Sequence, residues 1–187
     1  MKPRTAVVAI GGNSLIKDKQ HQTVRDQYIA AGETCWHIAA MIEEGWNVVI
    51  GHGNGPQVGD ELVRNEVARD DVAPLPLGVL VASTAGWIGY MIQQSVENAL
   101  RRVGSDRKVT TILTQVEVDP EDEALSNPTK FIGHAIPATR AQKLESEGHP
   151  VKVDSRGQYR RVVGSPTPKA IHEIELIRRL VSEGTIV

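Results

Sequence analysis

The chain has 187 residues, of which 40% are hydrophobic and 24% are charged, and its formal net charge is −2. These values are typical of a globular protein that buries a core of its own. They exclude a nucleic-acid-binding charge pattern, and no apolar run is long enough to cross a bilayer. A single cysteine, Cys35, excludes a disulfide framework. Because the amino terminus also lacks signal-peptide architecture, we expect a cytoplasmic protein.

Two short β-branched runs, 5–10 and 47–50, each lead directly into a glycine-rich turn. The first turn reads Gly-Gly-Asn-Ser at 11–14, and the second reads Gly-His-Gly-Asn-Gly-Pro at 51–56. Runs of this kind bounded by glycine are typical of buried strands in a parallel sheet. Between them, apolar residues recur at spacings of three and four, which predicts an amphipathic helix over 22–44 with Gly45 as its carboxyl-terminal cap.

The order strand, glycine turn, helix, strand, glycine turn has a spatial consequence. A right-handed crossover places both turns at the same carboxyl edge of one sheet, where α/β proteins bind ligands. Glycine lets backbone N–H groups approach an oxyanion, and each turn carries an asparagine whose amide could add a donor. Either turn alone could simply reverse the chain, but the pair favours a phosphate or carboxylate site. Its predicted substrate-binding residues are Gly11, Gly12, Asn13, Gly53, Asn54 and Gly55.

After the second turn the sequence predicts a helix over 56–69 and a proline-containing loop over 70–78. A longer helix follows from about 79 to 102, with glycines that suggest close packing or a ligand. A third strand is expected over 109–114, and turn residues predict a loop over 115–130.

The last third of the sequence predicts a short helix over 138–147 and then a β-hairpin formed by 151–153 and 159–163. Apolar residues at 171, 174, 177 and 181 mark a final helix, and 185–187 are like the opening of another buried strand.

These elements predict an α/β fold, a three-layer αβα sandwich with a mainly parallel sheet. We expect a substrate-side lobe over 1–130, a small protruding hairpin subdomain over 131–164 and a return to the main lobe over 165–187. Arg160 and Arg161 lie on the predicted hairpin, where neighbouring side chains face opposite ways, so we interpret them as solvated or ion-paired. For His52, a structural hydrogen bond to the backbone is at least as probable as a role in binding.

Six motifs in this order resemble those of carbamate kinases, within the amino-acid kinase superfamily. The combination is specific, above all the second turn together with the Asn-Pro-Thr-Lys stretch that ends at Lys130. The matching stretches are AIGGNSL at 9–15, GHGNGPQVG at 51–59, GWIGYMIQQ at 86–94, NPTKFIG at 127–133, YRRVVGSPTP at 159–168, and 171–187.

The resemblance implies phosphoryl transfer between carbamoyl phosphate and ADP, giving ATP and carbamate, with Mg²⁺ bound to the nucleotide. It implies that Lys130 contacts a phosphate, although by itself Lys130 could be one solvated lysine among many. It further implies a homodimer, a role in arginine metabolism, and no nucleic-acid or membrane partner. Similar proteins continue into a second lobe that holds the nucleotide. With that lobe absent, we predict that the 187-residue chain alone is inactive.

The sequence departs from the carbamate kinase pattern at three places. Gly78 replaces a usual aspartate, Thr84-Ala85 replaces a serine–glutamine pair, and Gly164 replaces a proline. Two alternatives therefore stay open: a related amino-acid kinase that phosphorylates another small carboxylate, and a non-catalytic fragment that binds anions or dimerises.

Overall fold

The computed structural model describes residues 4–16, 18 and 20–187, which divide into two compact units. The first unit comprises Met1–Asn54, Val81–Thr114 and Glu173–Val187, and the second comprises Gly55–Leu80 and Gln115–His172. The 131–164 segment expected as a subdomain lies entirely within the second unit. That unit also contains 55–80, 115–130 and 165–172.

A parallel sheet forms the centre of the first unit. Strands β1 (Thr5–Ile10) and β2 (Asn47–His52) pair in register from Thr5 opposite Asn47 to Ile10 opposite His52. The end of the chain extends this sheet, because Ile50 N donates to Val187 O at 2.7 Å and Ile186 forms a parallel bridge with Val109. Ile186 is 0% exposed, whereas Thr185 and Val187 are only partly buried, so the burial predicted for 185–187 is confirmed at Ile186.

The prediction of a strand over 109–114 is wrong, because within this stretch the structure has a single isolated bridge, at Val109. The backbone leaves the sheet at Thr111, whose N–H donates to Gln93 Oε1 at 2.9 Å and whose hydroxyl donates to Gly89 O at 3.0 Å. These bonds attach the segment to a helix rather than to a neighbouring strand. A Cβ on Gly89 would lie 2.4 Å from Thr111 Cγ2, so the expected close packing is confirmed there.

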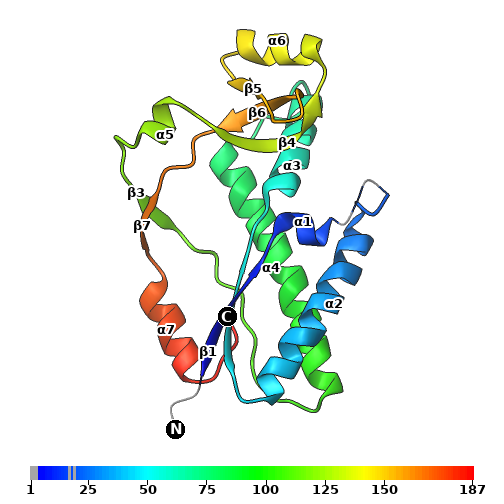
Figure 1. Cartoon of the computed structure of the whole chain (residues 1–187), viewed down its shortest axis with the longest axis vertical. Coiled ribbons are helices and arrows are strands. Elements are labelled where there is room, and N and C mark those ends of the chain that lie inside the picture. Colours follow the sequence, from blue (N-terminus) through cyan, green and yellow to red (C-terminus); the bar gives the residue numbers. More distant parts are fainter. Residues whose placement is uncertain (1–3, 17, 19) are drawn as a thin grey trace. The chain divides into compact units, whose positions relative to one another are not determined.

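Helices cover both faces of this sheet (Figure 1). Helices α2 (Val24–Glu43) and α4 (Leu77–Arg102) lie to one side of β1, while α7 (Ile174–Ser182) lies to the other. Both α2 and α7 contact β2, which is the layering predicted from the sequence. The core between the sheet and the α2–α4 layer includes Ile10, Leu15, Ala31, Cys35, Ile38, Ile42, Val48, Ile88, Met91 and Val96. The predicted apolar stripe on α2 is buried at Ala31, Cys35, Ile38 and Ile42, but Tyr28 is only partly buried and Val24 is 56% exposed.

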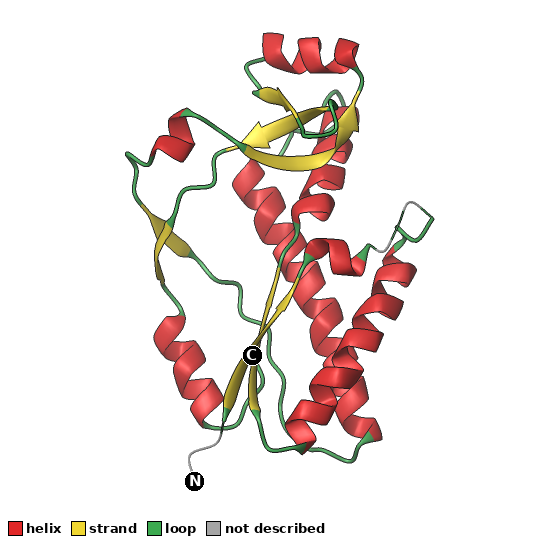
Figure 2. Cartoon of the chain, viewed as in Figure 1, coloured by secondary structure: helices red, strands yellow, loops and turns green. Residues whose placement is uncertain are grey.

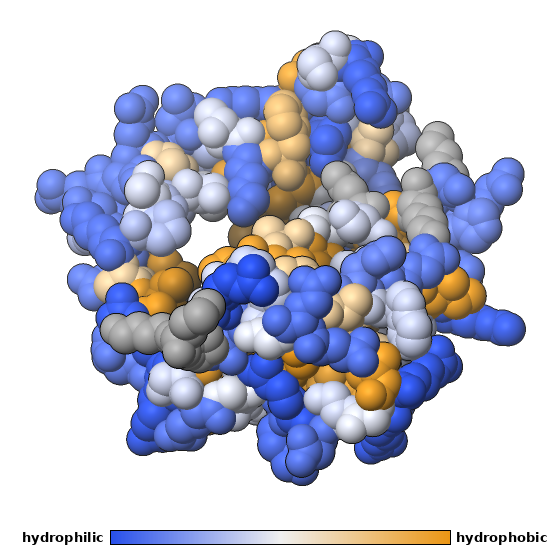
Figure 3. All heavy atoms as spheres, turned by 60° about the horizontal axis from the view of Figure 1, so that its bottom comes forward, coloured by the Kyte–Doolittle hydropathy of each residue, from blue (hydrophilic) through white to orange (hydrophobic). Residues whose placement is uncertain are grey.

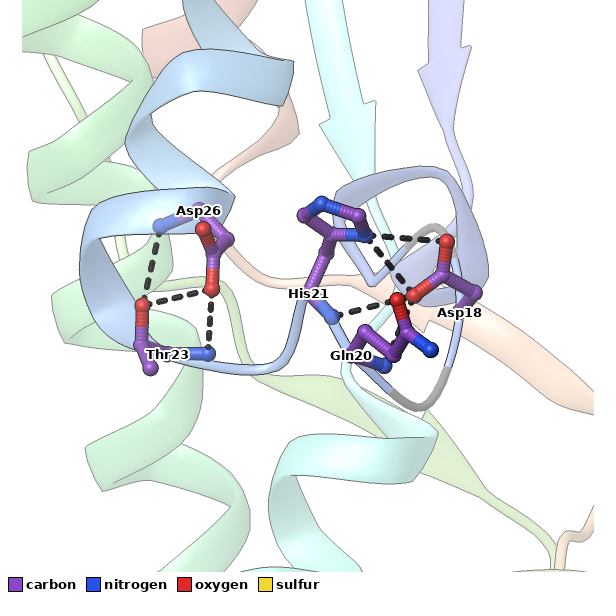
Figure 4. A network of polar contacts seen from close by, with 5 residues as sticks. All are labelled: Asp18, Gln20, His21, Thr23 and Asp26. Carbon is purple, nitrogen blue, oxygen red and sulfur yellow. Dashed lines mark hydrogen bonds and ion pairs between the residues drawn. The ribbon is translucent and has the colours of Figure 1, made fainter.

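The start of α2 is fixed by a capping box (Figure 4). Asp26 N donates to Thr23 Oγ1 at 3.2 Å, while the Asp26 carboxylate accepts from Thr23 N at 3.0 Å and from its hydroxyl at 2.6 Å. The Thr23 side-chain hydrogen bond lowers the pKa of Asp26. Just before the helix, a hydrogen bond with His21 lowers the pKa of Asp18. At the other end, Gly45 has a φ of +85°, as expected for a glycine cap.

The second unit contains an antiparallel sheet in the order β4 (Lys130–Ile136), β6 (Tyr159–Val163), β5 (Val151–Val153), shown in yellow in Figure 2. Pairing of β5 with β6 confirms the predicted hairpin. Helix α3 (Gly55–Val67) contacts β4, and α6 (Ala138–Ser146), which confirms the predicted short helix, contacts β5 and β6. A small core lies on the α3 side, formed by Val58, Leu62, Leu80 and Ile132, with Leu77 and Val163 beside it.

The prediction that 115–130 is a loop is also wrong, because this segment has secondary structure of its own. It contains β3 (Val116–Val118), which pairs antiparallel with β7 (Pro168–Ile171), and the short helix α5 (Glu123–Ser126). Asp122 caps α5 by accepting from Ala124 N at 2.9 Å. Lys130 consequently begins a strand rather than lying in a loop, and Ile171 belongs to β7 rather than to the last helix.

Several apolar side chains reach the surface of the chain. Val7 of β1 is 76% exposed, so β1 is not the fully buried strand that its sequence predicted. Its alternating exposure shows why: Ile10 and Val8 face the core, whereas Thr5, Val7 and Ala9 face away from it. Figure 3 shows a mainly hydrophilic face interrupted by apolar groups. Among the described residues, no helix is both long enough and apolar enough to cross a membrane.

Candidate functional site

The two glycine turns lie side by side at the carboxyl edge of β1 and β2. The last paired residues of the strands are Ile10 and His52, and Gly53 N continues the ladder by donating to Ile10 O at 2.8 Å. A Cβ on Gly53 would lie 3.2 Å from Gly12 N and 4.0 Å from Gly11 Cα. The predicted adjacency of the turns is therefore confirmed, and Gly53 is the residue that permits it.

The backbone donors of these turns are partly used and partly available. The N–H of Gly53 is occupied by Ile10 O, whereas those of Gly11 and Asn54 have no hydrogen-bond partner among residues 4–16, 18 and 20–187. Gly11 is exposed and caps the short helix α1 (Gly12–Leu15), with Ser14 N donating to its carbonyl at 2.9 Å. The side chain of Asn13 lies outside the described part of the chain.

The Asn54 side chain is directed at helix α4. Its Nδ2 donates to Thr84 Oγ1 at 2.9 Å and to Val81 O at 3.3 Å. Because a carbonyl can only accept, the contact with Val81 identifies the nitrogen side of the amide. The amide nitrogen of Asn54 is therefore bonded to helix α4, whereas the sequence suggested that it could donate to a bound anion. His52 makes the expected structural hydrogen bond, from Nδ1 to Gly53 O at 3.3 Å.

Two further site residues begin elements of the second unit. Gly55 is the first residue of α3, and a Cβ there would meet nothing within 4 Å. Lys130 is the exposed first residue of β4, and within the described residues its ammonium group makes no hydrogen bond or ion pair. The loop before it is anchored by Lys152, whose Nζ donates to Asn127 Oδ1 at 3.0 Å. A free ammonium group on the first residue of a strand, next to an anchored loop, can bind an anion.

Two motif glycines have a packing role that the sequence did not reveal. Gly59, which ends the second turn's motif, packs against Gly133, which ends the Asn-Pro-Thr-Lys motif. A Cβ on Gly59 would lie 2.1 Å from Gly133 Cα, and Gly133 has a φ of +66°. The contact lets α3 cross β4 at backbone distance. The contact between α3 and β4 explains why both motifs end in a glycine.

Of the two arginines of β6, Arg161 forms an ion pair, as predicted, whereas Arg160 is half-buried and is not ion-paired among the described residues. Arg161 lies 3.7 Å from Glu66 and donates through Nη2 to His149 Nδ1 at 3.1 Å, and burial lowers its pKa. Arg160 donates to Gly133 O at 2.7 Å and lies over the Phe131 ring. Glu66 also pairs with an arginine of α6, Arg140.

The site's chemistry is that of backbone amides at the edge of a parallel sheet. Such amides can bind an anion and orient it, and they require no side-chain nucleophile. The one thiol is unsuited to that role, because Cys35 is 0% exposed and burial raises its pKa to about 12. Parallel strands, covering helices and paired glycine turns together define an α/β protein with an anion-binding edge.

Comparison with known proteins shows what the chain is similar to. The chain is homologous to the amino-terminal part of carbamate kinases. It is 44% identical to the carbamate kinase of Pyrococcus horikoshii over 188 aligned residues, covering 99% of this chain and 60% of that protein. It is 42% identical to a carbamate kinase-like protein of Escherichia coli, covering 97% of this chain and 58% of that protein. Comparison with models of protein families found no match.

Solved structures give the same result for the fold. A carbamate kinase from Giardia lamblia bound to citric acid superposes with a TM-score of 0.91 at 32% identity, covering 99% of this chain and 60% of that one. The same enzyme bound to AMP-PNP gives a TM-score of 0.87. The predicted α/β class and the resemblance to carbamate kinases are therefore confirmed. The chain spans about 60% of the length of these relatives.

Proposed function

We propose that this chain forms the carbamoyl phosphate side of a carbamate kinase. The observation that carries the proposal is the pair of glycine turns, with Gly12 and Gly53 in backbone contact at one sheet edge. The homology to carbamate kinases supplies the reaction class. The bond from phosphorus to the carbamate oxygen breaks, a new bond forms to the terminal phosphate oxygen of ADP, and carbamate leaves as an anion.

This chemistry places few demands on side chains. The attacking and leaving oxygens are already anionic, so catalysis needs positioning and charge neutralisation rather than a general base. Backbone donors at Gly11 and Asn54 would hold the substrate beside Gly12 and Gly53, and Lys130 would contact a phosphate, as its motif implies. Mg²⁺ would enter with the nucleotide phosphates. Among the described residues, no group of three or more His, Cys, Asp or Glu side chains could hold a metal ion.

Two further features of the proposal come from the resemblance, a homodimer and a role in arginine metabolism, and the cytoplasmic location comes from the sequence features given above. A second lobe would bind ADP or ATP, and the chain spans only 60% of its relatives. We therefore predict that the 187-residue chain produces no ATP from carbamoyl phosphate and ADP in a coupled assay with Mg²⁺. Clear Mg²⁺-dependent turnover would contradict this prediction.

A kinase for another small carboxylate is the second candidate. It is favoured by the departure at Thr84, because that side chain touches Asn54 in the second turn. It is consistent with a relative named only as carbamate kinase-like and with the citric acid bound to the Giardia enzyme. Calorimetric titration with carbamoyl phosphate, acetyl phosphate and sulfate separates the candidates. Preference for carbamoyl phosphate supports the first, whereas preference for acetyl phosphate supports the second.

Binding by the isolated chain can be tested with two variants. Gly53→Val would push the turns apart, and Lys130→Ala would remove the free ammonium group. We expect each to weaken carbamoyl phosphate binding by about tenfold or more, the effect of losing one charge-assisted hydrogen bond. Wild-type affinity in both variants would contradict the assignment of the site. Anion binding without any turnover is the result that the proposal predicts for this chain, and it equally fits a non-catalytic anion-binding fragment.

A further inference from the structure

We infer that Thr84 is a positioning residue for the second glycine turn and that it acts through a hydrogen bond to the Asn54 side chain. The inference rests on the proposed function, because it assumes that the turn binds an anion. The residues that form its hydrogen-bond network, Asn54, Val81 and Thr84, belong to the first unit.

The turn needs an anchor because of its composition. Asn54 stands between two glycines, Gly53 and Gly55, which have more backbone freedom than any other residue. Neither has a positive φ, and a Cβ on Gly55 would meet nothing within 4 Å. The conformation of the turn is therefore not imposed by local sterics at Gly55. A restraint from outside the turn has to hold the Asn54 N–H in place.

Helix α4 supplies that restraint. Thr84 is 0% exposed, and its hydroxyl donates to Val81 O at 2.9 Å while accepting from Asn54 Nδ2 at 2.9 Å. Asn54 Nδ2 also reaches the same Val81 carbonyl at 3.3 Å. The three groups form a closed network, with the hydroxyl oriented by the helix and the amide oriented by the hydroxyl. Both hydrogen bonds that the Asn54 amide nitrogen makes among the described residues are to helix α4.

This geometry separates two possible roles of Asn54. A side chain that served as a ligand to an anion would direct its amide nitrogen at that anion. The nitrogen of Asn54 is bonded to the helix instead, Oδ1 is the only polar atom of the side chain without a partner among the described residues, and an acceptor repels an anion. Asn54 therefore contributes its backbone N–H, and its side chain holds that N–H in position. Preorganised donors bind more tightly because less conformational entropy is lost on binding.

The hydroxyl of Thr84 is the part that matters for this role. Thr84→Val keeps the shape of the side chain and removes the acceptor for Asn54. Thr84→Ser keeps the hydroxyl and removes a methyl group. Ser95→Ala is the matched control, because Ser95 is a nearly buried hydroxyl on the same helix that donates to Met91 O at 2.8 Å.

The test is calorimetric titration of the 187-residue chain and its three variants with carbamoyl phosphate, and separately with sulfate. Loss of one buried hydrogen bond predicts an affinity about tenfold lower for Thr84→Val. We expect Thr84→Ser and Ser95→Ala to stay within about twofold of wild type, because the anchor is intact in both. Urea unfolding of each variant shows whether Thr84→Val and Ser95→Ala lose similar stability while only the former loses affinity.

Three results would overturn the inference. Wild-type affinity in Thr84→Val would show that the anchor is not needed, and equal losses in Thr84→Val and Ser95→Ala would show a general effect of stability. Rapid solvent exchange of the Asn54 side-chain amide in the wild-type NMR spectrum would show that the network is open, and this measurement does not depend on any variant folding. If wild type binds neither anion, the proposed function itself fails.

Discussion

The two units of the chain use glycine for different purposes at their key contacts. In the first unit, Gly53 brings two exposed turns together, and a Cβ added to it would lie 3.2 Å from Gly12 N. In the second, the buried Gly59 lets a helix touch a strand, and a Cβ added to Gly59 would lie 2.1 Å from Gly133 Cα. The first contact leaves backbone donors available, whereas the second fills all the space between two elements.

The difference shows that glycines of one motif can have unrelated roles. Gly53 and Gly59 both belong to the 51–59 motif, yet one shapes a ligand edge and the other closes a packing contact. Function and folding should therefore respond separately to substitution along this motif. A change at Gly59 should affect stability, and a change at Gly53 should affect binding.

The largest effect is expected from Gly59→Ala. The added methyl group would overlap the Gly133 backbone, so α3 and β4 must separate, at a cost of about 3 kcal/mol. Urea unfolding followed by circular dichroism measures the change, and hydrogen exchange should locate it in α3 and β4. Gly86→Ala in α4 is the control: a Cβ there meets nothing within 4 Å, so helix propensity predicts a gain of about 1 kcal/mol. Similar stability in the two variants would contradict the packing role.

Arg107→Ala tests whether the first unit is stabilised by a side-chain clamp, by which we mean the hydrogen bonds that Arg107 donates to three other residues. Arg107 donates to Gly184 O at 2.7 Å, Trp46 O at 2.7 Å and Asn47 Oδ1 at 2.8 Å. Loss of these bonds should cost about 2 kcal/mol. Hydrogen exchange should quicken at Ile186 and Ile50, which lie in the part of the sheet that the clamp holds. Unchanged exchange at both positions would show that the clamp does not hold the sheet.

The smallest effect is expected for the pH dependence of stability that comes from the capping box of α2. The Thr23 side-chain hydrogen bond lowers the pKa of Asp26 below its ordinary value of 3.8. A depressed folded-state pKa adds stability above the unfolded value, and this stability is lost as the pH falls through the folded pKa. Asp26→Asn should therefore reduce stability at pH 7 slightly and leave a smaller difference from wild type near pH 2. A constant difference between the two proteins across this range would contradict the cap's electrostatic role.

Local patterns in the sequence were sufficient for elements defined by their own periodicity. The bounds predicted for β1 are those observed, and the hairpin of β5 and β6 is confirmed. Helix α2 begins two residues later than predicted because Thr23 caps it. In each case the determinant is local: alternation, turn residues or a cap.

Predictions failed where the determinant is distant in the sequence. The strand expected over 109–114 ends early because Thr111 bonds to α4, and β3 was missed because its partner is β7. The Gly59 contact with Gly133 and the use of Asn54 by Thr84 are of the same kind. The sequence thus located both turns of the candidate site, but it could not show which of their donors are free.

The central claim is that two adjoining backbone turns form the anion site. It is tested most directly by titrating carbamoyl phosphate into the ¹⁵N-labelled 187-residue chain and following its amide resonances by NMR. We predict saturable shifts at the free N–H groups of Gly11 and Asn54, with a smaller shift at Gly53, whose N–H is bonded to Ile10 O. Shifts elsewhere that leave both turns unchanged, or no saturable shift at all, would contradict the claim.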